Sequence, residues 1–215
     1  MNAVISPMQP MSSASAITVW GTSSKVVDQH GRLLPVFRGQ HGTAGHCAET
    51  LCASLSFGSA RAASVYALQP NDHSKTPQHP KVFPVFLDIR NPFVDCESDP
   101  FMDLSHYAGI FGLAETHRLA LKFKDHIYNT NAWEEVHEEF ESLEALIVSG
   151  SERLMELCLQ VYPLLDDADE VARLCEKGFD GAIHCGSGET AMEPEYRVFS
   201  KDQVRSIWDS SFFSC

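Results

Sequence analysis

Short apolar segments, each bounded by Gly, Pro, Asn or Ser, occur toward both ends of the chain. They are rich in β-branched and aromatic residues, which fit the half-buried surface of a pleated sheet. A polar run, NDHSKTPQHP, separates two of them and is typical of a loop. The pattern predicts strands over residues 16–20, 34–38, 54–58, 81–89, 181–185 and 196–200.

The middle of the chain has a helical period instead. From Trp133 to Ile147, apolar residues recur at spacings of three and four, which places them on one face of a helix. The opposite face is acidic, and it is either a solvated helix face or a docking surface for a basic partner. The acidic residues are Glu134, Glu135, Glu138, Glu139, Glu141 and Glu144.

Two further helices are expected before the chain returns to strands. A helix over 151–162 is predicted, because it starts at a serine that can cap its first turn. Asp167 or Asp169 predicts the start of another helix, which ends at Gly178. Because strands flank a helical region at about 100–177, we expect an α+β domain and not a doubly wound parallel sheet.

Length and composition bound the domain organisation. The chain has 215 residues, of which 44% are hydrophobic, and this is enough for one sizeable core. Residues 1–16 contain Ser, Pro and Met without the charged and apolar regions of a signal peptide, which indicates a disordered leader. Residues 17–215 are expected to form a single domain. No apolar run approaches the roughly 20 residues that a membrane helix needs.

Charge and cysteine usage narrow the class of partner. The net charge of -13 and the pI near 5.1 argue against binding to nucleic acid or to an anionic membrane, both of which require basic residues. A basic or neutral partner fits this charge better.

The seven cysteines, an odd number without regular spacing, favour a reducing environment over a fold held by disulfides.

Several familiar binding and catalytic motifs are excluded, because the residues they require are missing at the required spacing. CGSGET lacks the third glycine of a dinucleotide fingerprint, and HEEFE has Glu141 where a zinc-protease helix requires its second histidine. HGTAGHCAETLC offers His41, His46, Cys47 and Cys52, but no second ligand pair follows, so no metal is expected. A cysteine nucleophile, Cys47 or Cys52, stays open as an alternative function.

Two segments near the N-terminus carry candidate binding chemistry. PVFRGQHG is an apolar strand that leads into Arg38 and Gly39. Guanidinium binds phosphate through two hydrogen bonds, and glycine lets a ligand approach the backbone. SLSFGSARAASVYAL is a strand with Ser56 and Phe57, followed by a turn and a helix that contains Tyr66.

A pair of glutamates opens the last predicted strand. Glu193 and Glu195 flank Pro194 in the segment GSGETAMEPEYRVFS. Because the side-chain period of a strand is two, both carboxylates are expected to point to the same side. The pair is either surface decoration or two carboxylates that share catalytic work.

Together these segments resemble the mono-ADP-ribosyltransferase superfamily, in particular its arginine–serine–glutamate branch. That family has an aromatic Arg-Gly strand, a strand whose serine precedes a helix, and a glutamate that opens a late strand. Arg38, Ser56 and Glu195 fall in this order, although Ser56-Phe57-Gly58 replaces the usual Ser-Thr-Ser. VFPVFLDIRNPF, GFDGAIH and PEYRVFSKDQVRSI resemble phage-associated members. The resemblance covers 35–67, 81–94 and 178–208.

The resemblance implies a small split β-sandwich with a helical insert, which binds NAD as co-substrate between its two sheets. It assigns Glu195 to the ribose hydroxyl, where a carboxylate stabilises developing positive charge. By the same resemblance Arg38 would hold the phosphates, Gly39 would bond the carboxamide and Ser56 would orient Glu195. Phe57 and Tyr66 would enclose the nicotinamide ring, and Glu193 would act on the acceptor.

The resemblance further implies the class of acceptor. ADP-ribose would pass to a protein side chain, an arginine or a threonine of a host protein such as ubiquitin, as in bacterial effectors and toxins delivered to a host cytoplasm. We expect a monomer. A catalytically inactive relative that serves as a binding module is the second alternative.

Overall fold

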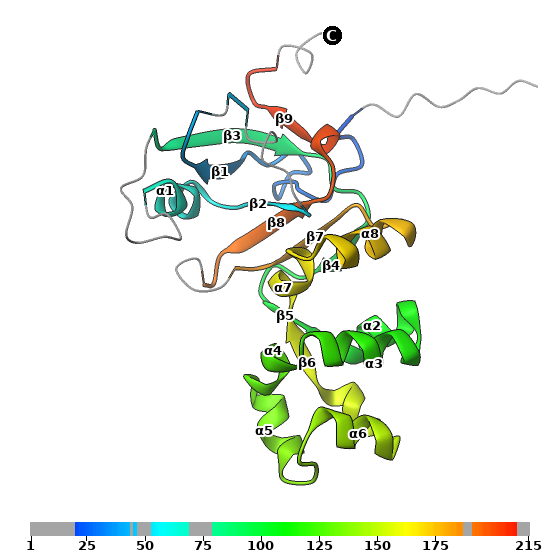
Figure 1. Cartoon of the computed structure of the whole chain (residues 1–215). Helices are drawn as coiled ribbons and strands as arrows, with labels where there is room; N and C mark the ends of the chain where they lie inside the picture. The colour runs from blue at the N-terminus through cyan, green and yellow to red at the C-terminus, as the bar shows by residue number, and fades with distance from the viewer. Residues whose placement is uncertain (1–19, 44, 47–52, 69–78, 187–190, 210–215) are drawn as a thin grey trace, which may run out of the picture.

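Two β-sheets are built from the N- and C-terminal parts of the chain, with a group of helices beside them (Figure 1). The computed structural model describes residues 20–43, 45–46, 53–68, 79–186 and 191–209. The first sheet has the order β1-β3-β9, and the second has the order β2-β8-β7-β4. The strands are β1 (Val36–Gln40), β2 (Leu55–Phe57), β3 (Lys81–Leu87), β4 (Pro92–Asp95), β7 (Gly181–Cys185), β8 (Pro194–Val198) and β9 (Val204–Ser206).

Pairing in these sheets is antiparallel between all neighbours except β4 and β7. The predicted α+β class is therefore confirmed, because a doubly wound sheet would be mainly parallel. The strand predicted over 16–20 lies outside the described residues except for Trp20, which is in a turn.

Among the described residues, the two sheets meet at one backbone bridge. Phe37 at the start of β1 and Gly58 just after β2 exchange two backbone hydrogen bonds, each 2.9 Å long. Phe37 lies opposite Pro84 in β3, which has no N–H to donate, so the polar groups of Phe37 face β2 instead. Beyond this bridge β1 pairs only with β3, and β2 pairs only with β8, so the two sheets separate.

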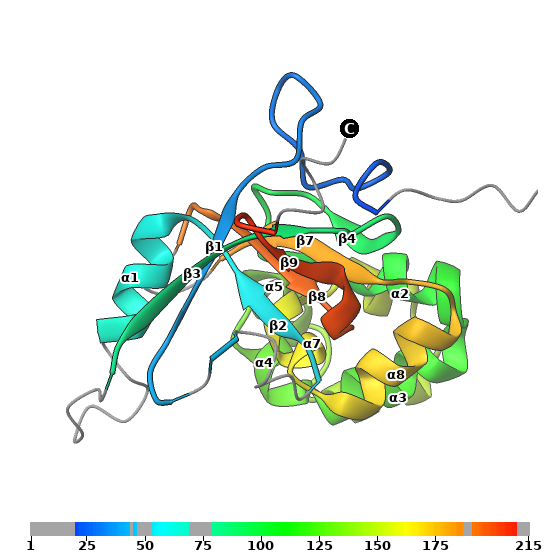
Figure 2. The ribbon, with the colours of Figure 1, turned by 90° about the horizontal axis from the view of Figure 1, so that it is seen from above.

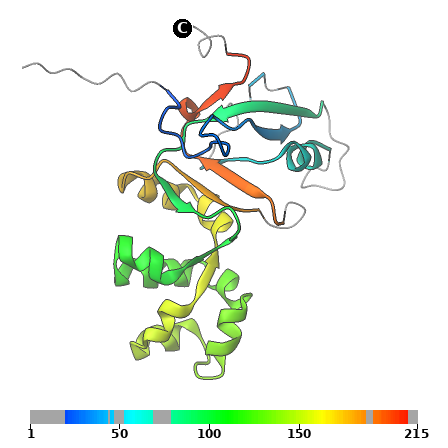
Figure 3. The same ribbon diagram turned by 180° about the vertical axis from the view of Figure 1, so that it is seen from behind.

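The helical insert forms the other half of the molecule (Figures 1 and 3). Its helices lie around a two-stranded antiparallel pair, β5 (Phe101–Asp103) and β6 (Cys158–Gln160). The insert contains α2 (Leu104–Phe111), α3 (Leu113–Lys122), α4 (Lys124–Tyr128), α5 (Asn131–His137) and α6 (Leu143–Ser149). Two more helices, α7 (Val161–Leu165) and α8 (Ala168–Glu176), lead back to β7.

The single helix predicted from Trp133 to Ile147 is wrong, because the structure has two helices there. Ser142 starts the second one, and its hydroxyl accepts a hydrogen bond from the Ala145 N–H at 3.1 Å. The apolar period concealed this break, since Phe140 between the two helices still packs against the core. All six glutamates of the predicted acidic face are exposed.

The helix predicted over 151–162 is also wrong. Ser151 does cap a helical turn, but this is a short 3₁₀ helix over Glu152–Glu156, and the chain then enters β6 and α7. Leu157 and Leu159 are both buried in alternation, which is the pattern of a strand. The third helix is confirmed as α8, with Asp167 as its cap and Gly178 at a φ of 88° just beyond its end.

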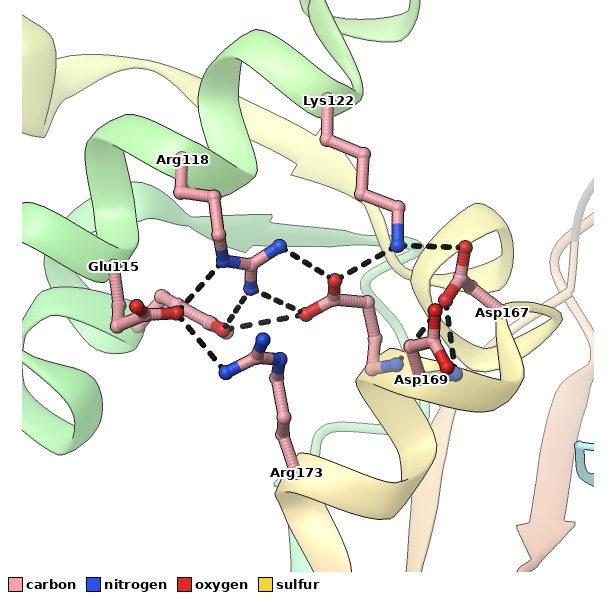
Figure 4. A network of polar contacts seen from close by, with 8 residues as sticks. Glu115, Arg118, Lys122, Asp167, Asp169 and Arg173 are labelled. Carbon is pink, nitrogen blue, oxygen red and sulfur yellow. Dashed lines mark hydrogen bonds and ion pairs between the residues drawn. The ribbon is translucent and has the colours of Figure 1, made fainter.

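A buried carboxylate of α8, that of Glu170, pairs with two cations of α3. Figure 4 shows these cations, Arg118 and Lys122, pointing from α3 toward α8. Glu170 is 1% exposed and accepts hydrogen bonds from Arg118 at 2.7 Å and from Lys122 at 2.9 Å. Burial would raise the pKa of Glu170, but the two cations outweigh it and hold the pKa below its ordinary value. The charge pairing therefore fixes α3 against the helix that leads into β7.

Helix α1 (Ala60–Leu68) packs on β1 through Gly39 (Figure 2). Ser59 caps this helix, and its hydroxyl accepts a hydrogen bond from the Ala62 N–H at 3.0 Å. A Cβ on Gly39 would lie 1.7 Å from the Ala63 carbonyl oxygen and 2.9 Å from the Ala67 nitrogen. The glycine is required because the helix backbone occupies the place of a side chain.

We expect Gly39→Ala to push α1 away from β1 and to lower the free energy of unfolding by about 1–3 kcal/mol. Urea unfolding of purified protein would measure this loss. Gly109→Ala in α2 is the control, because a Cβ there meets nothing within 4 Å and alanine favours a helix. Equal stability of the two variants would contradict the close packing at Gly39.

Candidate active site

Glu195 lies at the centre of the candidate site, on β8. Its side chain is 13% exposed. One carboxylate oxygen, Oε1, accepts a hydrogen bond from the Ser56 hydroxyl at 2.8 Å and another from the Arg197 Nε at 2.6 Å. Oε2 receives no hydrogen bond from the part of the chain that the structure describes. The carboxylate is thus held through one oxygen while the other is available to a ligand.

The register of β2 and β8 explains this arrangement. Ser56 lies opposite Arg197, two residues beyond Glu195 on β8. Because side chains alternate along a strand, Glu195 and Arg197 point to the same face of the sheet. Ser56 on the neighbouring strand therefore lies diagonally across from Glu195, within reach of its carboxylate.

Arg197 is a site residue that the sequence analysis missed. It is 8% exposed, and its Nη1 also donates to the Ser54 hydroxyl at 3.2 Å and to Asp166 Oδ1 at 2.7 Å. Two carboxylates, Glu195 and Asp166, therefore share its charge. The period of two that linked the glutamates would also have found this arginine, since it stands two residues after Glu195.

Glu195 is ionised at neutral pH. Burial would raise the pKa of this carboxyl, but the charge of Arg197 and the hydrogen bond from Ser56 outweigh burial and lower the pKa below its ordinary value. The Glu195 carboxylate thus carries a negative charge in a largely buried part of the sheet, where electrostatic interactions are stronger than in water.

His184 lies beside Glu195 on β7, directly opposite it in the sheet register. Its ring is 3% exposed, and Nδ1 donates to the Cys185 carbonyl oxygen at 2.8 Å. Nε2 is buried without a hydrogen-bond partner among the described residues and lies 3.9 Å from Glu195 Oε1. Burial lowers the pKa of His184, although the charge of Glu195 opposes the shift. A neutral imidazole therefore faces the carboxylate at neutral pH.

Arg38 and Gly39 lie on the other sheet, where β1 parts from β2. Arg38 Nη1 donates to the Ser56 carbonyl oxygen at 2.9 Å, so it spans the two sheets. Backbone polar groups alternate between the edges of a strand, and those of Phe37 face β2. The N–H and C=O of Gly39 consequently face the same edge, past the bridge, where β1 has lost its partner.

The two glutamates have separate partners. Glu193 is not in a strand, and its Oε2 accepts a hydrogen bond from the Ser59 hydroxyl. Its Oε1 binds the Nε and Nη2 of Arg61 in the first turn of α1. The hydrogen bond from Ser59 and the charge of Arg61 lower the pKa of Glu193. It therefore faces the N-terminus of α1 as a charged group.

The two aromatic residues differ in accessibility. Tyr66 on α1 is 44% exposed, as a ring open to a ligand must be. Phe57 is 1% exposed and packs in the core cluster of the two sheets. The expectation that Phe57 encloses a ligand ring is therefore corrected: adjacent strand residues point to opposite faces, and Ser56 takes the face of Glu195.

The alternative chemistries gain no support from the described residues. Cys47 and Cys52 lie outside them, and His41 and His46 are exposed. Within the described ranges no group of three His, Cys, Asp or Glu side chains could hold a metal ion. No helix in these ranges has the length and apolar character to cross a membrane.

Comparison with known proteins places this chain in no group. No family model, no curated protein and no solved structure matches it.

We expect the buried neutral His184 to make stability depend on pH. The pKa of His184 is lowered from 6.5 by folding, so the unfolded chain binds a proton first. The stability that the neutral His184 side chain contributes is complete above pH 6.5 and decreases as the pH falls toward the folded pKa. The free energy of unfolding then falls by at most about 1.4 kcal/mol per pH unit.

Urea unfolding between pH 7 and pH 5 would test this expectation. His184→Gln should flatten the loss of unfolding free energy below pH 6.5, the ordinary value for the side chain. His41→Gln, which replaces an exposed histidine, should keep the slope of the unmodified chain. An unchanged slope in His184→Gln would contradict a buried neutral imidazole.

Proposed function

We propose that this chain is a mono-ADP-ribosyltransferase that moves ADP-ribose from NAD to a protein side chain. The observation that carries the proposal is the hydrogen bond between Ser56 and Glu195, two residues 139 positions apart on adjacent strands. Arg38, the third residue of the arginine–serine–glutamate set, contacts the backbone of the same serine. Three segments that the resemblance selected together, and that lie far apart in the sequence, thus have residues in contact.

The split between the sheets supports the finer fold that we propose, a split β-sandwich of the ADP-ribosyltransferase type. Such a fold binds NAD where its two sheets separate. Here the sheets join at Phe37 and Gly58 and part immediately beyond. Arg38, Gly39, Ser56 and Glu195 all come from strand positions next to that join.

The hydrogen-bond donors and acceptors near the Phe37–Gly58 bridge match the chemical groups of NAD. The open Oε2 of Glu195 can accept a hydrogen bond from a ribose hydroxyl, and the outward edge of Gly39 offers an N–H and a C=O to a carboxamide. Arg38 supplies a guanidinium for phosphate, and Tyr66 supplies an exposed aromatic ring. Phe57 has no part in this set because it is buried in the core.

Each residue has a role in the proposed reaction. NAD supplies the ADP-ribosyl group, and nicotinamide leaves with the electron pair of the broken carbon–nitrogen bond. Glu195 stabilises positive charge that develops on the ribose, while Ser56 and Arg197 hold its carboxylate in place. Glu193 takes the proton that the acceptor side chain loses as its new bond forms.

The acceptor is a protein in this proposal. The net charge of -13 favours a basic face on that protein, because complementary charge speeds encounter and suppresses wrong partners. Ubiquitin remains one candidate. An inactive binding module remains the alternative, and the same assays separate it from an enzyme, since only an enzyme releases nicotinamide.

We expect Glu195→Gln to lower turnover by about 10²–10³ and to leave NAD binding largely intact. The amide keeps the shape of the side chain but loses the negative charge, which is worth about 10²–10³ in rate for a group of this kind. Nicotinamide release and calorimetric titration with NAD would measure the two effects, and Arg38→Ala should weaken NAD binding instead.

Glu134→Gln is the control for Glu195→Gln, because Glu134 is an exposed glutamate of the helical insert. It should match the unmodified chain in both assays. If Glu195→Gln lost NAD binding but kept its rate at saturation, the proposed role of Glu195 would be wrong. No nicotinamide release by the unmodified chain would reject the transferase itself.

We expect Glu193→Gln to separate the two halves of the reaction. Water can still take the ribosyl group when Glu193 is lost, so NAD hydrolysis should remain measurable. Labelling of acceptor proteins should fall by roughly 10²–10⁴, the usual worth of a general base. Nicotinamide release and mass spectrometry of labelled lysate proteins would be measured on one preparation.

Two other outcomes of that experiment would decide against this role. Parallel loss of hydrolysis and labelling would mean that Glu193 and Glu195 act as one unit. Unchanged labelling would make Glu193 a surface residue of the loop before β8.

A further inference from the structure

A buried ring nitrogen of His184 lies beside the Glu195 carboxylate. The Cys185 carbonyl oxygen can only accept a hydrogen bond, so the neutral His184 ring carries its hydrogen on Nδ1, 2.8 Å from that oxygen. Nε2 consequently has a lone pair and is itself an acceptor. It has no partner among the described residues and lies 3.9 Å from Oε1 of Glu195. Two acceptors are thus neighbours, and Nε2 has no donor in the described part of the chain.

The sheet holds the ring in this position. His184 on β7 and Glu195 on β8 are directly opposite in the antiparallel register, so both side chains point to the same face. The ring is only 3% exposed, and the hydrogen bond to Cys185 fixes its orientation. A proton on Nε2 would turn this atom into a donor. A shift of about 1 Å would then bring Nε2 and Oε1 to hydrogen-bond length.

Three charged side chains act on this ring from two parts of the chain. Glu195 and Arg197 lie on β8, and Asp166 follows α7. Burial has the largest effect on the pKa of His184 and lowers it, as does the charge of Arg197. The two carboxylates oppose this shift, Glu195 more strongly than Asp166. The ring therefore senses the charge of Glu195 directly.

Other carboxylates near β7 face away from the ring. Asp95 on β4 is level with the residue before His184 and so points to the opposite face of the sheet. Glu97 accepts a hydrogen bond at 2.9 Å from the hydroxyl of Tyr196, which packs in the core of the two sheets. The Asp99 carboxylate accepts one from the backbone N–H two residues further along. Glu195 and Asp166 are thus the carboxylates that a charged ring would meet.

The balance of charge shows what a proton on the ring would change. Glu195 and Asp166 supply two negative charges, and Arg197, which binds both, supplies one positive charge. These contacts carry a single negative charge as long as His184 is neutral. A protonated ring brings the sum to zero and places a second cation beside Glu195. The negative charge that could stabilise a developing cation is then cancelled.

We propose that His184 is an acid-sensitive switch on Glu195. While the ring is neutral, the carboxylate keeps its negative charge for the ligand. When Nε2 takes up a proton from solvent, it donates to Oε1, and the carboxylate no longer acts as a free charge. The effect on turnover rests on the proposed function, whereas the coupling of the two side chains does not.

An NMR titration of the full chain with labelled histidine rings, from pH 8 to pH 4, tests the coupling without NAD. The signal of His184 is identified by its loss in His184→Gln. Glu195→Gln should lower the pKa of His184 relative to the unmodified chain, because the carboxylate no longer stabilises the charged ring. Asp166→Asn should lower this pKa by less.

Glu97→Gln is the matched control for Glu195→Gln. It removes one negative charge near the same strands, and its amide oxygen can still accept the hydrogen bond from Tyr196. Because Glu97 faces away from the ring, the pKa of His184 should stay that of the unmodified chain. Equal shifts in Glu97→Gln and Glu195→Gln would mean that net charge, and not the contact with Glu195, governs the ring.

The pH dependence of nicotinamide release from NAD tests the switch itself. Release by the unmodified chain should fall about tenfold per pH unit below the pKa of His184 that NMR gives. His184→Gln takes up no proton there and should keep its rate until Glu195 is protonated, below the ordinary carboxyl pKa of 4.5. The rates are compared only at pH values where circular dichroism shows both proteins folded.

The inference is overturned if Glu195→Gln leaves the pKa of His184 unchanged, or if the folded chain takes up no proton on this ring above pH 4. It is also overturned if His184→Gln loses nicotinamide release at the same pH as the unmodified chain. Coupling without any release would keep the paired side chains and reject the transferase. Release without coupling would keep the transferase and reject the switch.

Discussion

The backbone hydrogen bonds between Phe37 and Gly58 are the constraint on which the candidate site depends. A complete ladder between β1 and β2 would close the edge of β1 and leave no opening. A single bridge instead sets the two strands in register and then lets the sheets part. Pro84 enforces this arrangement from the other side, because it cannot pair with the polar groups of Phe37. The site is the place where backbone pairing stops, next to Arg38 and close to Glu195.

Electrostatic balance is the second requirement, because Glu195 keeps a charge in a buried sheet. An isolated buried carboxylate would take up a proton. Arg197 prevents this, yet an arginine paired with Glu195 alone would cancel much of the negative charge of the carboxylate. Asp166 accepts a hydrogen bond from the same guanidinium and thus divides its attraction. The neutral ring of His184 adds bulk beside the carboxylate without adding a cation.

The sequence predicted the central residues of the candidate site better than it predicted the side chains that contact them. Arg38, Ser56 and Glu195 were expected together through the family resemblance, and their hydrogen bonds confirm that the three residues are neighbours. The assignment of Phe57 failed on a rule available from the sequence, since a residue adjacent to Ser56 must face the opposite side. The contact between Arg61 and Glu193 could not be predicted, because it depends on how the loop before β8 meets α1 across 132 positions of the chain. The helix break before Ser142 could not be predicted, because Phe140 in the link between the two helices still packs against the core and continues the apolar period.

The helical insert contacts the candidate site through the end of α7. The Ser54 hydroxyl, which accepts a hydrogen bond from Arg197, itself donates to the Leu165 carbonyl oxygen at 2.8 Å. Asp166, the next residue, binds Arg197 directly. The end of α7 therefore positions the guanidinium that positions Glu195. Glu170 ties α8, the next helix along, to α3 through ion pairs with Arg118 and Lys122. Contacts therefore extend from α3 of the insert to the guanidinium beside Glu195.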